Sequence, residues 1–268
     1  MTSLTLHSAH QSLSFDPGLG GRVTSWIVDG LEVLTRAGTH PAEHGMYPMA
    51  PWAGRLRDNR ITPEQRERWG FPGEEYAPAA TYAGWALHGT CLDAPIDESR
   101  IDGDRIEMRQ RIPGWSATLV TRWTVTDHRA ESVLTVEADA PTPALLGWHP
   151  WFPTVLDGAR ARWTLRGECA VREGAFASGE WQTWADGHRR VDDAFHVPDG
   201  MATITWGQRT LRIRNSDPWF VVFDEREDGL CVEPQNGPPN AFDTPLRGAA
   251  PVARPGAPVS MATTWKWT

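Results

Sequence analysis

The most constraining feature of this sequence is a long succession of short segments in which apolar and polar residues alternate. Examples are RIEMRQRI from Arg105, MATITW from Met201, TLRIRN from Thr210 and VSMATTWKWT from Val259, with Gly, Pro, Asn or Asp between the segments. A period of two places successive side chains on opposite faces of a strand, so the pattern predicts many half-buried β-strands. Many short strands at regular spacing are typical of a sandwich or a barrel.

Other segments extend the prediction. GGRVTSWIVDGLEVLTR, from Gly20, is interpreted as two strands that meet at Asp29-Gly30, a pair that favours a hairpin turn. ATLVTRWTVTD and SVLTVEADA are predicted strands, and the HRAE between them, from His128, is interpreted as a turn. Helical periodicity is weak, and only TPEQRERWG, from Thr62, predicts a short helix. RGAAPVARPGAPVS, from Arg247, is interpreted as a loop before the last strand.

The composition is that of one globular domain. No composition shift, internal repeat or low-complexity tract divides the sequence, so we expect residues 1–268 to form a single domain. The three cysteines form no CxxC motif, which indicates neither a disulfide framework nor a structural zinc site. The sequence has neither a signal-peptide pattern nor an apolar stretch long enough to span a bilayer. We therefore expect a cytoplasmic protein with no membrane partner.

Charge and residue usage exclude several function classes. The net charge of -8 argues against a nucleic-acid partner, because nucleic-acid binders present a basic face. The single lysine, Lys266, lies near the end of the sequence, which disfavours a Schiff base or a phosphate-loop lysine. The 15 tryptophans have two interpretations: core residues of a β-protein, or aromatic platforms that pack against the flat C–H faces of sugars.

Candidate functional residues lie in five turn-flanked segments. The sequence contains none of the motifs G-x-S-x-G, H-E-x-x-H or Walker A. The polar candidates are Arg55 in PWAGRLRDNRI, His88 in GWALHGTCLDAP, His149 in GWHPWF, Asp192 and Asp193 in RVDDAF, and Glu233 in CVEPQNGPPNAF.

Each candidate also has a purely structural explanation. Arg55 can form a surface ion pair and His88 can hydrogen-bond within a loop. His149 can satisfy a backbone carbonyl near Pro150, which ends the strand ladder. Asp192 and its neighbour can form a turn. Glu233 is harder to explain in this way, because it follows the apolar GLCV and an unpaired buried carboxylate is costly.

Taken together, these segments resemble the motifs of the aldose 1-epimerases, or galactose mutarotases, and of their wider mutarotase-like superfamily. GGRVTSWIVDGLEVL is similar to the family's opening hairpin, GRLRDNRI to its NRI/RDGR segment, and LHG to its His-Gly motif. WHPWF resembles NHxYF, VDDAF resembles DHxF, and VEPQNGPPNAF resembles ETQ…P-x-A. The motifs occur in the family's order and the resemblance covers most of the chain.

The resemblance implies an all-β fold, a large antiparallel β-sandwich (the mutarotase-like supersandwich) with an open sugar-binding cleft. It implies an isomerase, an aldose 1-epimerase that interconverts the anomers of a free aldohexose without a cofactor or a metal, as a monomer or a homodimer. In this interpretation the catalytic pair is Glu233 as base and His149 as acid. The sugar would be bound by Arg55, His88, Asp192 and Trp148, and whether Asp192 or Asp193 faces it stays open.

The protonation of the pair depends on opposing effects. Glu233 and Asp192 would raise the pKa of His149, whereas burial beside Trp148 and Trp151 would lower it. Desolvation would raise the pKa of Glu233 toward that of a more competent base.

The sequence departs from the family pattern and leaves alternatives open. Trp148 stands where longer members often have asparagine, Asn59 replaces a glycine, and we find no counterpart of a QPG segment. The many arginines also suit a hexose-6-phosphate 1-epimerase. A non-catalytic carbohydrate-binding protein and a glycoside hydrolase that uses Asp192 and Glu233 are further alternatives. A metal site built from His88, His149 and a carboxylate is disfavoured, because no histidines show tight ligand spacing.

Overall fold

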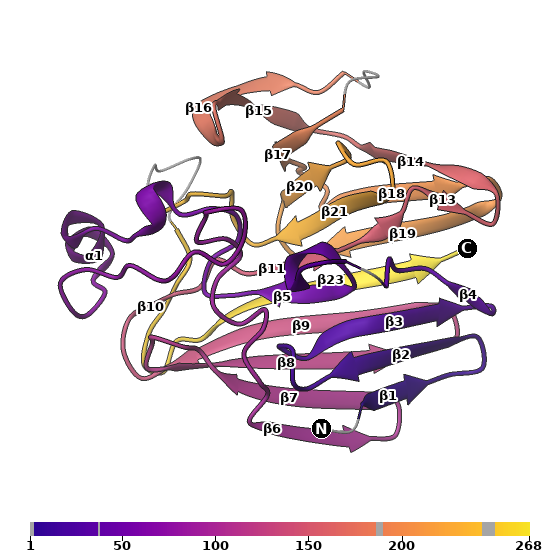
Figure 1. The fold of residues 1–268 in the computed structure, drawn as a ribbon, viewed down its shortest axis with the longest axis horizontal. Helices are drawn as coiled ribbons and strands as arrows, with labels where there is room; N and C mark the ends of the chain where they lie inside the picture. Colours follow the sequence, from indigo (N-terminus) through magenta and orange to yellow (C-terminus); the bar gives the residue numbers. More distant parts are fainter. Residues whose placement is uncertain (1–2, 37, 186–189, 243–249) are drawn as a thin grey trace.

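The computed structural model describes residues 3–36, 38–185, 190–242 and 250–268. In this part of the chain, two large antiparallel sheets lie one over the other (Figure 1), so the predicted all-β sandwich is confirmed. Burial follows the alternation that predicted the strands. In the last strand, Met261, Thr263, Trp265 and Trp267 are buried, and the residues between them are more exposed.

The larger sheet has the strand order β1-β2-β3-β5-β11-β21-β20-β17-β15-β16, with β4 paired to β3 and β12 paired to β21. Its strands are β1 (Leu4–His7), β2 (Gln11–Asp16), β3 (Arg22–Val28), β4 (Leu31–Glu32), β5 (Met46–Met49), β11 (Gly147–Pro150), β12 (Phe152–Pro153), β15 (Glu168–Glu173), β16 (Phe176–Thr183), β17 (Asp192–His196), β20 (Trp219–Phe223) and β21 (Gly229–Gln235).

The smaller sheet has the order β13-β14-β18-β19-β23-β9-β8-β7-β6. Its strands are β6 (Glu98–Asp102), β7 (Arg105–Arg111), β8 (Ala117–Val125), β9 (Arg129–Ala138), β13 (Val155–Leu156), β14 (Ala159–Leu165), β18 (Met201–Trp206), β19 (Arg209–Asn215) and β23 (Val259–Trp267). A separate two-stranded ribbon pairs β10 (Thr142–Pro143) with β22 (Val252–Ala253).

The core between the sheets is rich in tryptophan. Trp26 of β3 packs edge-on against Trp123, Trp265 and Trp267 of the smaller sheet, with ring centroids 6.0–6.4 Å apart. One apolar cluster joins buried residues of both sheets. Core packing is therefore the explanation for these four tryptophans, and replacing one with alanine would cost about 3–5 kcal/mol.

Two local predictions are confirmed. The strands β3 and β4 meet at Asp29-Gly30, and both residues have positive φ (47° and 80°), as a tight hairpin turn requires. The predicted helix is α1 (Pro63–Trp69), where the hydroxyl of Thr62 accepts from Gln65 N and the Gln65 side chain accepts from Thr62 N. Gly70, at φ 74°, ends the helix.

Two other interpretations need adjustment. HRAE is a turn only at His128, because β9 begins at Arg129 and Ala130 pairs with Val125; the bend between β8 and β9 lies at Asp127 and His128. The loop predicted from Arg247 lies partly outside the described residues, and Val252–Ala253 within it form β22. Short 3-10 helices occupy Pro41–Glu43 and Arg57–Asn59. Among the described residues, no helix has the length and apolar character needed to cross a bilayer.

Candidate active site

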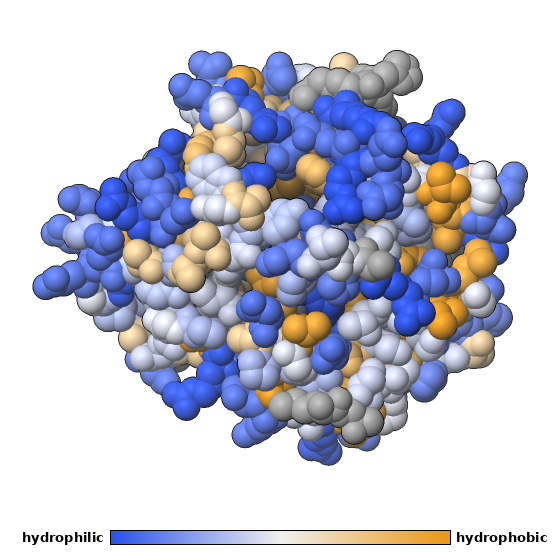
Figure 2. All heavy atoms as spheres, in the orientation of Figure 1, coloured by the Kyte–Doolittle hydropathy of each residue, from blue (hydrophilic) through white to orange (hydrophobic). Residues whose placement is uncertain are grey.

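An open cavity with about 950 Å³ of empty space, open solvent at its mouth included, lies on the outer face of the larger sheet. Strands β11, β15, β17, β20 and β21 and the loops around residues 54, 88 and 240 contribute to it. Figure 2 shows the hollow in this face of the molecule, below the β15–β16 hairpin at the top of Figure 1. The cavity contains five of the six residues that the resemblance implicated: Arg55, His88, His149, Asp192 and Glu233.

His149 and Glu233 meet at the floor of this cavity. The neighbouring antiparallel strands β11 and β21 pair Gly147 with Gln235. Two residues later in β11 is His149 and two residues earlier in β21 is Glu233, so these two residues lie beside each other. His149 Nε2 lies 3.2 Å from Glu233 Oε1, and the two side chains are only 7% and 3% exposed. The structure therefore joins the two residues that the sequence analysis paired.

Trp148 does not belong to the cavity, which corrects its assignment as a sugar-binding residue. Side chains alternate along β11, so Trp148 points away from His149 into the core, where its ring lies 4.9 Å from that of Trp123. The aromatic wall is Trp151, whose ring centroid lies 5.3 Å from that of His149. Its Nε1 donates to Ala42 O at 2.7 Å, which fixes the ring against the cavity.

Burial controls the protonation of the pair. Desolvation, followed by the nearby charge of Asp192, raises the pKa of Glu233 well above its ordinary value. A hydrogen bond from Gln235 Nε2 to Glu233 Oε2 (3.3 Å) acts in the opposite direction without reversing the shift. Desolvation, followed by the charge of Arg22, lowers the pKa of His149 to about 3. Both shifts favour the neutral pair, with the shared proton on Glu233.

A buried cation beneath His149 contributes to this shift. The ring of Tyr47 stacks on His149, with centroids 4.8 Å apart and planes 10° apart. The guanidinium carbon of Arg22 lies over the same tyrosine ring, 4.6 Å from its centroid. Arg22 is fully buried and donates to the carbonyl oxygens of Pro41, His44 and Leu92, and burial lowers its pKa to about 10.

Steric crowding explains why glycine follows His88 in the LHG motif. Gly89 has φ 80°, and a Cβ at this position would lie 1.9 Å from Ala50 O, so only glycine fits. His88 also has positive φ (61°), and its Nδ1 accepts a hydrogen bond from Gly54 N at 3.3 Å. Its ring lies 4.7 Å from that of His149. Burial, His149 and Arg55 lower the pKa of His88 well below its ordinary value, so His88 is neutral.

Arg55 and Asp192 face each other across the cavity mouth. Arg55 Nη2 lies 3.4 Å from Asp192 Oδ2, and Arg172 Nη1 lies 3.9 Å from the same oxygen. Strand register pairs Asp192 with Phe223, a cavity residue, and Asp193 with Val222, a core residue. By this register Asp192 shares the cavity-facing side of β17, but Asp193 also lines the cavity, and its Oδ1 lies 3.8 Å from Arg172 Nε. Which of the two aspartates meets a ligand stays a prediction.

Several residues that line the cavity or lie beneath its floor were missed by the sequence analysis. Gln235 lies two residues from Glu233 on a strand, so alternation alone places it on the same face. Tyr47 and Arg22 had no local signal, because their positions depend on how β3, β5 and β11 pair. Arg226 lies 4.8 Å above the Trp151 ring and is paired to Asp228 at 2.7 Å.

The site also contains a set of metal-ligand atoms. His149, Glu233 and the thiol of Cys231 offer ligand atoms within 4.8 Å of one another, and all three residues are buried. This set differs from the His88 and His149 combination considered from sequence. Burial raises the pKa of the Cys231 thiol well above its ordinary value, which keeps it protonated and makes it a poor ligand.

Comparison with known proteins shows which fold this is. No family model matches the chain, and no curated protein is significantly similar to it in sequence. Solved structures match over the whole chain. A candidate aldose 1-epimerase from Escherichia coli K12 superimposes with a TM-score of 0.80 at 20% identity, covering 100% of this chain and 99% of that one. The chain has the galactose mutarotase-like fold.

Other solved structures of this fold also match over nearly the whole chain. A galactose mutarotase-like protein from Clostridium acetobutylicum gives a TM-score of 0.81 at 12% identity, covering 99% of this chain and 95% of that one. A galactose 1-epimerase from Lactobacillus acidophilus gives 0.74 at 14% identity, covering 99% and 94%. At such identities the likeness establishes the mutarotase-like fold, and the activity has to be argued from the site.

Proposed function

We propose that this protein is an aldose 1-epimerase, an isomerase that interconverts the α and β anomers of a free aldohexose. The observation that carries the proposal is the 3.2 Å contact between the buried side chains of His149 and Glu233 at the floor of an open cavity. Ring opening requires one group that accepts a proton and one that donates a proton, both within reach of the same hemiacetal carbon. The names of the structural neighbours support the same reaction class.

In the proposed reaction, Glu233 as a carboxylate accepts the proton of the anomeric hydroxyl O1. His149 as an imidazolium donates a proton to the ring oxygen O5. The C1–O5 bond breaks while C1 and O1 form a carbonyl. The aldehyde then rotates about C1–C2, and the reverse steps close the ring on its other face. Protons and electrons balance within the pair and the sugar.

The electrostatics of the cavity suit this exchange. Ring opening converts the ionic pair into the neutral pair, in which Glu233 holds the proton, and burial favours that neutral form. The charge of Arg55 acts in the other direction, because it lowers the pKa of Glu233. A sugar hydroxyl that donates to Glu233 also favours the carboxylate. Arg55 and the bound hydroxyl therefore reduce, without reversing, the preference of the cavity for the neutral pair.

The remaining cavity residues have binding roles in this proposal. Arg55 and Asp192 present a donor and an acceptor 3.4 Å apart, a spacing suited to vicinal hydroxyls. His88, which is neutral, can donate through Nε2 because its Nδ1 already accepts from Gly54. Trp151 supplies the apolar wall for the C–H face of the ring.

The pH profile of kcat/KM should lack an inflection at the ordinary histidine pKa. The active form holds one proton on the pair. It gains a second proton when His149 is protonated, near pH 3, and loses its only proton at the raised pKa of Glu233. We therefore expect no loss of activity on acidification through the ordinary histidine pKa of about 6.5, and a loss on the alkaline side at the raised pKa of Glu233. Measuring kcat/KM from about pH 4 to about pH 9 checks this. A decline that begins at the ordinary histidine pKa on acidification would contradict it.

A hexose 6-phosphate is the second candidate substrate. Three guanidinium groups, those of Arg55, Arg172 and Arg226, line the cavity. Each also lies within 4.0 Å of a carboxylate oxygen, so their charge is already offset inside the protein. This pairing favours an uncharged sugar over a phosphorylated one.

Anomer exchange measured by NMR on a panel of free and phosphorylated aldohexoses tests the proposal. Exchange of a free hexose above the spontaneous rate supports it, and exchange of the 6-phosphates alone favours the second candidate. Sugar binding by calorimetry without faster exchange would indicate a carbohydrate-binding protein. Release of a reducing sugar from an aryl glycoside would indicate a glycosidase that uses Asp192 and Glu233. Either of these last two results overturns the epimerase assignment.

A further inference from the structure

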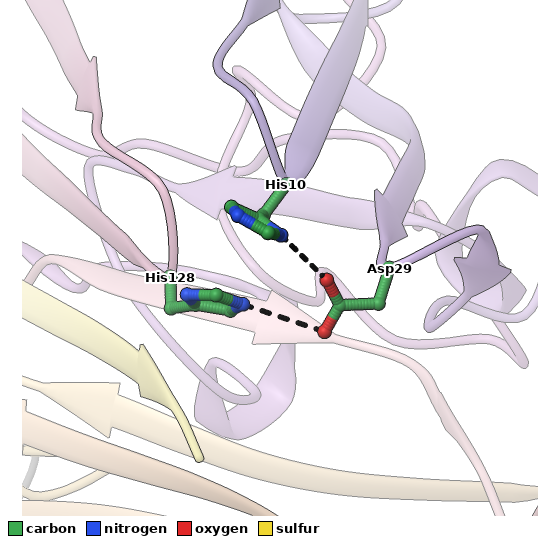
Figure 3. Close-up of side chains that lie close together, drawn as sticks. All are labelled: His10, Asp29 and His128. Atoms are coloured by element: carbon green, nitrogen blue, oxygen red, sulfur yellow. Dashed lines mark hydrogen bonds and ion pairs between the residues drawn. The ribbon is translucent and has the colours of Figure 1, made fainter.

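Three side chains with metal-ligand atoms meet at the end of the sandwich on the right of Figure 1. Figure 3 shows them: His10 from the β1–β2 turn, Asp29 from the β3–β4 turn, and His128 from the β8–β9 turn. None of the three lines the cavity described above. The cluster has no part in the proposed epimerase reaction, and its residues lie on both sheets.

Each of the two histidines contacts a different oxygen of the Asp29 carboxylate. His10 Nδ1 lies 3.0 Å from Asp29 Oδ1, and His128 Nε2 lies 3.4 Å from Asp29 Oδ2. The imidazole rings stack, with centroids 4.4 Å apart and planes 29° apart. The stacking brings a ring nitrogen of each histidine to the same carboxylate, so the three side chains present their ligand atoms to one small volume.

Backbone contacts hold the three turns together. Asp29 N donates to His10 O at 2.8 Å, and Trp267 N donates to His128 O at 2.9 Å. Ala9 N donates to a carboxylate oxygen of Asp127 at 3.3 Å, which ties the first turn to the third. The fold therefore fixes the backbone of the three turns that carry the ligand atoms, and the exposed ion pairs between the side chains add little stability of their own.

The donor set matches a transition metal. Imidazole nitrogen with one carboxylate suits zinc, nickel or copper, and three protein ligands leave the fourth position of a tetrahedral site to water. Zinc bonds of about 2.0–2.2 Å imply neighbouring ligand atoms about 3.4 Å apart in a tetrahedron. The histidine nitrogens lie 3.0 and 3.4 Å from the two different oxygens of the Asp29 carboxylate. One ligand atom from each of the three residues falls within 4.8 Å of the others, which is near the spacing of a tetrahedral site. We propose that His10, Asp29 and His128 form a surface site for a divalent transition-metal ion.

A neighbouring cation modulates this site. Arg209 Nη1 lies 4.0 Å from Asp29 Oδ2 and its Nε lies 3.7 Å from Asp157 Oδ2. The positive guanidinium of Arg209 and a metal ion would both interact with the negative Asp29 carboxylate, so they compete for it. Arg209→Gln should therefore tighten metal binding, a change that a purely structural ion pair would not produce.

Equilibrium dialysis of the untagged, EDTA-treated protein against zinc chloride tests the site. We expect one zinc ion per chain, and His10→Ala, His128→Ala and Asp29→Asn should each weaken binding by at least about tenfold. Asparagine tolerates the positive φ of position 29, so that variant keeps the turn. Cobalt substitution should give the visible absorption of a tetrahedral site, and this signal should be absent from the same variants.

Two controls locate the metal. His7→Ala removes an exposed histidine of β1 outside the cluster, and Cys231→Ala removes the thiol of the buried set in the cavity. Both should bind zinc as the wild type does. The proposal is overturned if the wild type takes up no zinc, if the cluster variants bind it unchanged, or if Cys231→Ala loses it. Anomer exchange is not the readout, so failure here leaves the proposed function untouched.

Discussion

Replacing Glu233 with glutamine should reduce enzyme-catalysed anomer exchange by about 10²–10⁴-fold in kcat, the usual contribution of one general base. The amide has nearly the same shape but cannot accept the O1 proton. Glu233 is 2% exposed, so solvent cannot easily provide a substitute base at that position. NMR exchange spectroscopy, with the spontaneous rate subtracted, measures the effect. Glu227→Gln, an exposed position just before the same strand, is the matched control and should retain wild-type turnover.

The same variant also has a predicted stability signature. The folded-state pKa of Glu233 is raised, so the protonated group favours the folded state below its unfolded pKa of about 4.5. That contribution is lost as pH rises from there through the raised folded pKa. Glutamine does not titrate, so Glu233→Gln should gain thermal stability relative to the wild type at alkaline pH. A variant that is inactive because it unfolds would instead have a lower melting temperature, and a folded variant with normal turnover would refute the role of Glu233.

Replacing His149 with asparagine should lower kcat by a similar factor, about 10²–10⁴-fold, because asparagine cannot donate a proton to O5 at neutral pH. Asparagine is small enough to keep β11 paired with β5 and β21, where His149 faces Tyr47 and Glu233. The measurement is again exchange spectroscopy, with kcat and KM determined separately. The loss should fall on kcat, since the sugar-binding groups at the cavity mouth are unchanged.

The double variant separates a working pair from two independent residues. Glu233 and His149 share one transferable proton, so Glu233→Gln combined with His149→Asn should lose little more activity than either single change. His7→Asn is the control for the histidine, because His7 is exposed on β1. Losses that multiply fully in the double variant would show that the two residues act independently and would contradict the shared-proton mechanism.

Much of the fold was predictable from local patterns. The strands with clear alternation, such as β18, β19 and β23, lie where the period of two placed them. The hairpin at Asp29-Gly30 and the capped helix α1 follow from residues within a few positions of each other. Short strands such as β5, β12 and β13 lack a full alternation, and their existence depends on neighbours that are distant in the sequence.

The sequence predicted most of the residues of the candidate site but not how they are arranged in space. The resemblance selected His149 and Glu233, and the structure brings them together. It failed for Trp148, because adjacent residues on a strand face opposite sides and Trp151, beyond the strand end, takes the place at the cavity wall. The cation beneath Tyr47 and the cluster of His10, Asp29 and His128 carried no sequence signal, since each set comes from three separate segments.

The sequence by itself determined which residues share a face within each strand, because the direction of a side chain depends on its position along an extended backbone. It also determined the tight turns, because Asp29-Gly30 and Gly89 need backbone conformations that few residues adopt. Only the tertiary structure decided which strands are neighbours, and so which side chains meet. The placement of β11 beside β21 makes a shared proton site of His149 and Glu233, and the burial that follows sets their pKa values. Neither strand pairing nor desolvation is encoded by any single segment.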